Sequence, residues 1–213
     1  MTGLALSLLT AYLLGSLSGS LLLGRLRGVD IRAQGSGNAG GTNAFRTQGW
    51  RFALGVVVID IGKGALTAWF ACRLLANQPE LLQIGPLAAA LAAVCGHVWP
   101  VFHGFRGGKG AATLVGGLLV LWPWSLPWLL GAWALVLAAT GYVGLSTVIA
   151  GAVLVPVAAA DGPWQSPRML FALIVALLLA FTHRSNLARL RAGNEFRFER
   201  ARVFHRLWTR ARG

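Results

Sequence analysis

Long apolar stretches alternate with short polar segments along the whole chain. A helix that spans a membrane needs about 20 mainly apolar residues, and the stretches at 111–122 and 169–182 are short for a span. The pattern predicts an all-α, polytopic bundle of transmembrane helices with seven spans, or with five if residues 111–160 cross only once. The seven stretches are Leu4–Leu23, Phe52–Leu75, Leu82–Phe102, Ala111–Trp122, Leu126–Thr140, Tyr142–Ala160 and Met169–Thr182.

The composition supports an integral membrane protein. Hydrophobic residues make up 56% of the 213 residues, charged residues only 12%, and the mean hydropathy is +0.64. A soluble domain would carry about a quarter charged residues. We expect one domain, residues 1–213, without a cleavable signal peptide, because no basic segment precedes the first apolar stretch. Cys72 and Cys95 lack metal-ligand spacing, so we expect them to pack between helices.

The net charge of +13 would suggest a nucleic-acid partner on a soluble protein. Here the basic residues lie at the ends of apolar stretches. With seven spans, sixteen of the 19 basic residues fall on one side, Arg73 and Arg168 fall on the other, and Lys63 lies inside a helix. The positive-inside rule makes the first side cytoplasmic, so we expect the N-terminus outside and the C-terminus inside. The basic tail, residues 183–213, could lie on anionic headgroups.

The first polar segment, Gly35–Arg46, is unlike a simple connection between membrane helices. It holds four glycines, two asparagines, a serine, a threonine and an arginine. Closely spaced glycines let a backbone turn its N–H groups toward an anion, and short polar side chains with an arginine add donors. The spacing Gly35-x-Gly37-x-x-Gly40 matches a dinucleotide fingerprint, but that motif needs a βαβ unit. We expect a phosphate cradle at the membrane edge, with Gly37, Asn38, Thr42 and Asn43 as binding candidates and Ser36 and Arg46 beside them.

A second polar segment, residues 104–110, places two glycines before a lysine and ahead of an apolar helix. It is not a Walker A loop, which would need glycine at His103 and serine or threonine at Gly110. Backbone N–H groups, a helix N-terminus and an ammonium group still form an anion site together. A tight turn with a cytoplasmic lysine is the alternative. The candidates for phosphate binding are Arg106, Gly107, Gly108 and Lys109.

Three other polar groups leave alternatives open. Segment His183–Glu195 follows the last apolar stretch, and Glu195 is either an interfacial salt-bridge partner or part of a site. Asp60 and Lys63 lie three residues apart inside the second stretch. They can pair on one helix face, either as a structural ion pair or as the polar end of an active site. His97 either packs near the interface or serves in phosphate binding or proton transfer.

Several common catalytic patterns are absent from the sequence. No histidine is followed five residues later by aspartate, no Gly-x-Ser-x-Gly elbow occurs, and no cluster of acidic residues suggests a magnesium site. An enzyme with this sequence is expected to work without a metal, a cofactor or a covalent serine intermediate.

Four stretches together resemble the bacterial acyl-phosphate:glycerol-3-phosphate acyltransferase family. They are GSLSGSLLLGRLRGVDIRAQGSGNAGGTNAFR at 15–46, VVIDIGKGA at 57–65, GHVWPVFHGFRGGKGAAT at 96–113 and HRSNLARLRAGNE at 183–195. The family is an integral membrane enzyme. It transfers a fatty acyl group from acyl phosphate to the 1-position of glycerol 3-phosphate and releases inorganic phosphate. Two departures, Ser18 near a usual proline and Gly41 in place of alanine, remove no functional group.

The resemblance implies a bacterial inner-membrane enzyme with a cytoplasmic active site and no nucleic-acid or obligate protein partner. Ser36 and Arg46 would be essential, Gly107, Gly108 and Lys109 would bind the phosphate of glycerol 3-phosphate, and the third motif would supply Asn186, Gly193 and Glu195. His97 and His183 are candidate proton acceptors. We favour a substrate phosphate as the base, because no histidine–carboxylate pair is evident in the sequence. A membrane transporter or channel for a phosphorylated metabolite is the rival interpretation, although such proteins place their sites near the midplane.

Overall fold

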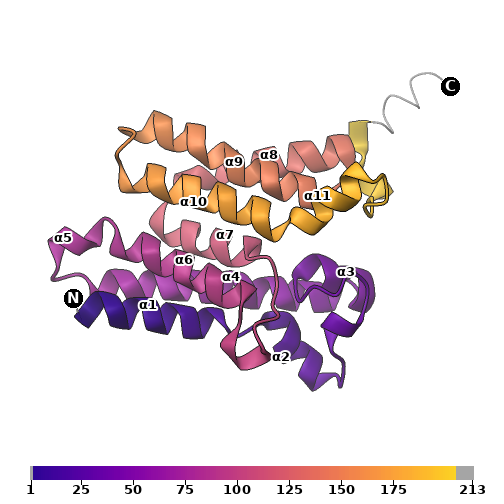
Figure 1. Cartoon of the computed structure of the whole chain (residues 1–213), viewed down its shortest axis with the longest axis horizontal. Coiled ribbons are helices and arrows are strands. Elements are labelled where there is room, and N and C mark those ends of the chain that lie inside the picture. Colours follow the sequence, from indigo (N-terminus) through magenta and orange to yellow (C-terminus); the bar gives the residue numbers. More distant parts are fainter. Residues whose placement is uncertain (1, 205–213) are drawn as a thin grey trace. The chain divides into compact units, whose positions relative to one another are not determined.

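The 25-residue helix α4 (Trp50–Leu74) organises the first of two compact units, which divide after Pro123. The computed structural model describes residues 2–204 (Figure 1). Helices α1, α2, α3, α6 and α7 all pack against α4. The other elements of this unit are α1 (Thr2–Gly15), α2 (Gly19–Leu26), η1 (Ile31–Ala33), α3 (Gly41–Gln48), α5 (Pro79–Leu82), α6 (Gly85–Val98), η2 (Val101–His103) and α7 (Ala111–Leu121).

Two helix pairs in the first unit approach until their backbones touch. A Cβ on Gly64 of α4 would overlap the Thr113 carbonyl of α7, and a Cβ on Gly116 of α7 would overlap the Ile61 carbonyl of α4. Helices α1 and α6 meet in the same reciprocal way through Gly15 and Gly96. Small residues permit such close packing where lipid supplies no hydrophobic drive between helices. The apolar stretches therefore carry contact information that hydropathy alone does not reveal.

The second unit is a three-helix antiparallel arrangement followed by a folded segment. Helix α9 packs against both α8 and α10, and Trp133 of α8 donates an indole N–H to the Thr147 hydroxyl of α9 at 3.3 Å. Gly151 of α9 lies against Leu179 of α10. The elements after α7 are η3 (Pro123–Ser125), α8 (Leu126–Thr140), α9 (Val143–Asp161), α10 (Pro167–Thr182), α11 (Arg184–Arg191) and η4 (Glu199–Ala201).

Exposed apolar side chains and a buried ion pair distinguish this chain from a soluble domain. Val58, Leu135 and Leu177 are 60%, 60% and 72% exposed, whereas Asp60 and Lys63 are buried. Exposed apolar side chains around an interior that also holds charged groups suit a hydrocarbon environment. Within residues 2–204, four helices are long and apolar enough to cross a membrane, and six are if each of two bent helix pairs forms one span. The chain is thus an all-helical, multi-pass membrane protein.

The structure departs from the expected helices at three places. The stretch Leu4–Leu23 was expected to be one helix, but it breaks between α1 and α2 with a bend of 42°. The polar segment 35–46, expected as a loop, contains a helix, α3, in its second half. The stretches at 52–75, 111–122, 126–140, 142–160 and 169–182 form helices close to the expected bounds, and Leu82–Phe102 is divided among α5, α6 and η2. The expectation for the tail beyond residue 204 lies outside the described residues.

Candidate active site

The first polar segment is organised around the buried side chain of Asn43 on α3. Its Nδ2 donates to the carbonyl oxygens of Ile31, Gln34 and Asn38 at 3.1, 3.0 and 3.0 Å. Its Oδ1 accepts the N–H of Ser36 at 2.9 Å. Asn43 was expected to bind phosphate, but its hydrogen-bonding capacity is used within the segment, so the structure gives it the role of shaping the loop.

Ser36 lies exposed at the tip of this loop between two glycines with positive φ. Gly35 has φ 57° and Gly37 has φ 72°, values that glycine adopts at little cost. A Cβ on Gly35 would also overlap Oδ1 of Asn43. Residue 35 must therefore be glycine, both because of its positive φ and because there is no room for a side chain. This requirement explains the tight turn of the loop.

Helix α3 carries two of the other candidates from the first segment. Thr42 lies in its first turn and Arg46 in its last, one turn apart, and both are half-buried. Residues four apart on a helix share one face. The hydroxyl and the guanidinium can therefore serve the same ligand.

The second polar segment folds back onto the end of α6. Gly107 N–H donates to the Val98 carbonyl at 3.1 Å, and Gly108 N–H donates to the His97 carbonyl at 3.0 Å. These two N–H groups were expected to face an anion, and that expectation is wrong because α6 carbonyls occupy them. A Cβ on either glycine would overlap His97. Close approach to α6 therefore explains why both positions are glycine.

Lys109 lies just after these glycines, immediately before the start of α7. It is half-buried, and Gly110 after it caps α7 with φ 89°. The first-turn N–H groups of a helix have no partner within the helix and attract anions. The start of α7 and Lys109 thus remain the candidates for anion binding in this segment.

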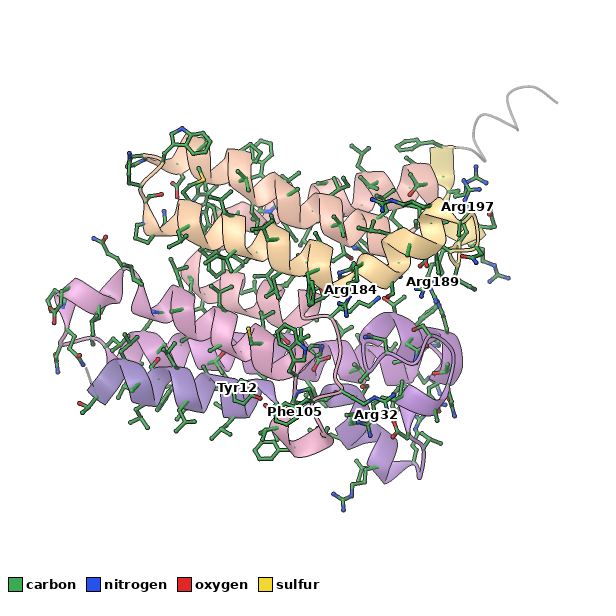
Figure 2. The ribbon with its side chains drawn as sticks, viewed as in Figure 1. Tyr12, Arg32, Phe105, Arg184, Arg189 and Arg197 are labelled. Carbon is green, nitrogen blue, oxygen red and sulfur yellow. The ribbon has the colours of Figure 1, made fainter. Side chains whose placement is uncertain are left out.

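The two polar segments are joined within the first unit. Gly107 carbonyl accepts the Ala39 N–H at 3.3 Å and the Asn38 side chain at 3.5 Å. Arg32 spans the same gap, donating to the carbonyls of His103 at 2.8 Å and Arg106 at 3.3 Å. Figure 2 labels Arg32 and also Phe105, which lies between those two acceptors in the chain. These hydrogen bonds bring the two polar segments together, and the exposed Arg106 contributes its backbone carbonyl to the join.

Arg32 is itself held by Asp30, and neither residue is among the predicted site residues. Nε and Nη2 of Arg32 donate to the Asp30 carboxylate at 2.8–3.2 Å. These hydrogen bonds hold the pKa of Asp30 below its usual value. Asp30 also caps η1 by accepting the Arg32 N–H. An Asp-x-Arg pair at the start of a glycine-rich segment is the signal that could have identified the contact.

Three ionisable side chains meet in the interior of the first unit. Lys63 Nζ lies 3.0 Å from Asp60 Oδ1 and 2.8 Å from His97 Nδ1. His97 Nδ1 lies 3.4 Å from Asp60 Oδ1. The expected pairing of Asp60 with Lys63 is confirmed. A histidine–carboxylate pair that is not evident in the sequence also forms, because α4 and α6 bring together residues that the sequence separates by 34 or more positions.

The third motif lies in the second unit and is built around the buried carboxylate of Glu195. Asn186 Nδ2 donates to Oε1 and Arg189 Nε donates to Oε2, each at 2.7 Å. Gly193, with φ 73°, turns the chain back after α11 so that Glu195 reaches them. Figure 2 labels Arg189 and also Arg197, whose Nε donates to the Thr140 carbonyl at 2.9 Å. The motif is therefore one folded element rather than a loose basic tail.

His183 lies at the junction of α10 and α11, with the helix axes bent by 56°. The side chain is buried, and Nδ1 lies 2.8 Å from the Leu179 carbonyl. A carbonyl oxygen only accepts, so Nδ1 carries a proton. A role for His183 in proton transfer would have to use Nε2.

Comparisons with known proteins point to one family. The family model described as "Glycerol-3-phosphate acyltransferase" matches residues 5–193. A glycerol-3-phosphate acyltransferase of Chlorobaculum parvum is 38% identical, with 88% of this chain and 93% of that protein covered. One of Trichlorobacter lovleyi is 40% identical, with 89% and 94% covered.

Solved structures show the same likeness. The crystal structure of PlsY (YgiH), an integral membrane glycerol 3-phosphate acyltransferase in its glycerol 3-phosphate form, superposes with a TM-score of 0.84 at 30% identity. That match covers 94% of this chain and 98% of the other. Its lysophosphatidic acid form gives a TM-score of 0.81. The chain belongs to the glycerol-3-phosphate acyltransferase family.

Proposed function

We propose that this protein transfers a fatty acyl group from acyl phosphate to the 1-hydroxyl of glycerol 3-phosphate, giving lysophosphatidic acid and inorganic phosphate. The observation that carries the proposal is the match over 94% of the chain to an acyltransferase in its glycerol 3-phosphate form. The family model runs through both units, which supports treating residues 1–213 as one functional domain.

The chemistry needs positioning more than a strong nucleophile, because phosphate is already a good leaving group. The acceptor oxygen bonds to the acyl carbonyl carbon, the bond from that carbon to the phosphate oxygen breaks, and the phosphate leaves with the electron pair. The hydroxyl proton goes to a phosphate oxygen of a substrate. The protein contributes orientation and stabilisation of negative charge.

Residues of the first unit are proposed to hold the phosphates. Lys109 and the start of α7 bind the phosphate of glycerol 3-phosphate, with Gly107 and Gly108 setting the path of that loop. Arg46 and Thr42 share a face of α3, and Ser36 lies exposed at the neighbouring loop tip. The tie from Gly107 to Ala39 fixes the two loops relative to each other, which supports one composite phosphate site.

For the third motif we propose the catalytic roles that the family resemblance implies for Asn186 and Glu195. Both oxygens of Glu195 are engaged by Asn186 and Arg189. Glu195 thus orients the Asn186 amide rather than accepting a proton. His183 is retained as a candidate through Nε2 alone.

The proposed topology has seven spans, an external N-terminus and a cytoplasmic C-terminus in a bacterial inner membrane. Helix α7 has 11 residues and is about 16 Å long, short of the bilayer core. It nevertheless runs in backbone contact with α4, a full-length span. If α7 did not cross, the tail with its nine arginines would lie outside, against the positive-inside rule.

An activity assay with the purified protein in detergent tests the proposal. We expect inorganic phosphate to be released only when acyl phosphate and glycerol 3-phosphate are both present, with lysophosphatidic acid formed in equal amount. Release without glycerol 3-phosphate, or uptake of that metabolite into proteoliposomes without acyl transfer, would contradict it. The second result would favour a transporter.

Lys109→Ala tests the phosphate assignment within that assay. Because the ammonium group is proposed to contact the ground-state phosphate, the KM for glycerol 3-phosphate should rise, while the KM for acyl phosphate changes less. The matched control is Arg73→Ala, which removes a basic residue from the last turn of α4, outside both polar segments. An unchanged KM for glycerol 3-phosphate in Lys109→Ala would exclude the assignment.

A further inference from the structure

We infer that Asp60 and Lys63 are positioning residues for the acyl transfer, and that His97 belongs to their cluster rather than acting as the base. The inference rests on the proposed function above. It concerns a buried group of side chains beneath the glycine-rich loop, and it follows from hydrogen-bond counting and from how that group is connected to both polar segments.

Lys63 has as many acceptors as it has N–H donors. Nζ lies 2.9 Å from the Leu17 carbonyl, 3.0 Å from Asp60 Oδ1 and 2.8 Å from His97 Nδ1. An ammonium group has three donors and no acceptor. His97 Nδ1 must then accept, which places the proton of a neutral imidazole on Nε2. Neither nitrogen of His97 is left to take a proton from a substrate.

The surroundings of His97 also separate it from substrate. His97 is only 3% exposed to solvent. A Cβ on Gly108 would overlap Nε2, so the loop backbone covers that edge of the ring. Nδ1 faces Lys63 on the other edge. A general base must reach the proton it removes, directly or through one water, and this ring is enclosed on both nitrogens.

The ion pair has a second task at the break between α1 and α2. A broken helix leaves carbonyls at the end of one segment and N–H groups at the start of the next. Lys63 donates to the Leu17 carbonyl, and Asp60 Oδ1 accepts the Gly19 N–H at 3.2 Å. One charged pair thus caps both sides of the break, where unsatisfied groups inside a membrane would be costly.

These contacts close a ring that runs through both polar segments. From His97, the backbone carbonyl holds Gly108, and the neighbouring Gly107 carbonyl holds the Ala39 N–H. The Ala39 carbonyl in turn accepts the Ser20 hydroxyl at 2.7 Å. Ser20 follows Gly19, which is bound to Asp60. The cluster therefore sets the position of the first segment and of the glycine-rich loop at once.

His97 variants separate a base from a positioning residue. His97→Asn keeps an acceptor near the Nδ1 position but has no basic nitrogen, whereas His97→Leu has neither. We expect His97→Asn to retain clearly more kcat/KM than His97→Leu, with the loss appearing mainly as a higher KM for glycerol 3-phosphate. The pH profile of kcat should keep its shape in His97→Asn. Loss of a true base would lower kcat on the order of 10²–10⁴-fold in both variants.

Lys63→Met tests the cluster itself, and we expect kcat/KM to fall on the order of 100-fold through loop displacement. Because Asp60 would then be buried without a cation, the double variant Asp60→Asn/Lys63→Met is measured beside it. Asparagine can still accept the Gly19 N–H, so this variant should fold. Thr67→Val, one turn along α4, is the control, since Thr67 donates to the Gly64 carbonyl and lies outside the ring.

Binding of glycerol 3-phosphate is measured by calorimetry without acyl phosphate. This measurement distinguishes failure of the proposed function from failure of the positioning role. If the wild-type protein neither binds glycerol 3-phosphate nor turns over, the proposed function fails. If the wild type does both, weaker binding in His97→Leu and in the double variant supports the positioning role. A folded His97→Asn that binds like wild type but has lost kcat would overturn the inference, as would a double variant with wild-type binding and KM.

Discussion

Each unit organises its polar motif around one buried carboxylate, but the two carboxylates are neutralised differently. Asp60 pairs with Lys63, and their side chains are 2% and 6% exposed. Glu195 is 3% exposed, but its partner Arg189 is 37% exposed. In the first cluster each buried charge is neutralised by the other. In the second cluster the guanidinium of Arg189 can instead be hydrated by solvent. The same type of contact should therefore be indispensable in one unit and adjustable in the other.

The largest effect should follow from Asp60→Leu. Removing one partner of a buried ion pair leaves the other charge without compensation, which costs about 3–5 kcal/mol. Unfolding of the detergent-solubilised protein would measure the loss. The control is Asp60→Leu/Lys63→Leu, which should recover part of the stability because no isolated charge remains. A single variant as stable as the double variant would show that water already reaches Lys63.

The sequence predicted this pair but not its setting. Asp60 and Lys63 are neighbours on one helix face, so a local rule finds them. Hydropathy averages polarity over a window, so it does not detect that the Leu17 carbonyl and the Gly19 N–H take side-chain partners at the helix break. The break was therefore missed. His97 joins through tertiary packing across 34 residues, a separation that no local pattern encodes.

The candidate site shows the same division between local and tertiary information. The charge pattern of the sequence placed the two polar segments on one side of the membrane, but it did not show that they contact each other. The prediction that the Gly107 and Gly108 N–H groups face an anion is wrong. The local sequence is the same whether a loop N–H group is unpaired or is bonded to a carbonyl of α6. Asn43 likewise reads as a ligand until its four partners in the loop are seen.

Asn43→Ala should have the next largest effect and extends the comparison to a neutral loop organiser. The substitution removes partners from three carbonyls and one N–H. Each buried polar group without a partner costs about 1–3 kcal/mol, but the loop is exposed enough to admit water. We expect a loss of about 2–3 kcal/mol and a higher KM for glycerol 3-phosphate. Thr47→Val, which removes a hydroxyl bonded to the Asn43 carbonyl, should change little. Equal losses in both variants would contradict this role.

Glu195→Leu should cost less than Asp60→Leu although it removes an equally buried carboxylate. Hydrogen bonds to charged groups contribute about 1.5–3 kcal/mol, and exposure of Arg189 reduces the share of its ion pair. We expect a loss of about 1–2 kcal/mol that shrinks further in high salt. Unfolding midpoints at two salt concentrations would measure it. A cost as large as that of Asp60→Leu would show that the two clusters are equivalent.

Gly193→Ala isolates the turn that brings Glu195 back to Asn186. Gly193 has φ 73°, and a Cβ there would meet no atom within 4 Å, so any effect is conformational. The left-handed region costs an L-residue about 1–2 kcal/mol, partly offset by the lower entropy of the unfolded chain. A net loss of about 1 kcal/mol is expected in the unfolding assay. Gly131→Ala, at a helical position equally free of neighbours, should be neutral or stabilising.

The smallest effect should come from the turn at Phe105 in the second polar segment, where the residue with positive φ is not glycine. Phe105 has φ 57° and is 58% exposed, so its ring contributes little packing within the protein. Phe105→Gly should relieve backbone strain of about 1–2 kcal/mol while adding unfolded-chain entropy of about 0.4–1 kcal/mol. The net gain is then between about 0 and 1.6 kcal/mol, lowered further by the little packing that the ring contributes, and Gly193→Ala should change stability in the opposite direction. A loss of stability in Phe105→Gly would show that contacts of the aromatic ring with lipid or protein stabilise the fold. Those contacts would then outweigh the backbone strain at residue 105.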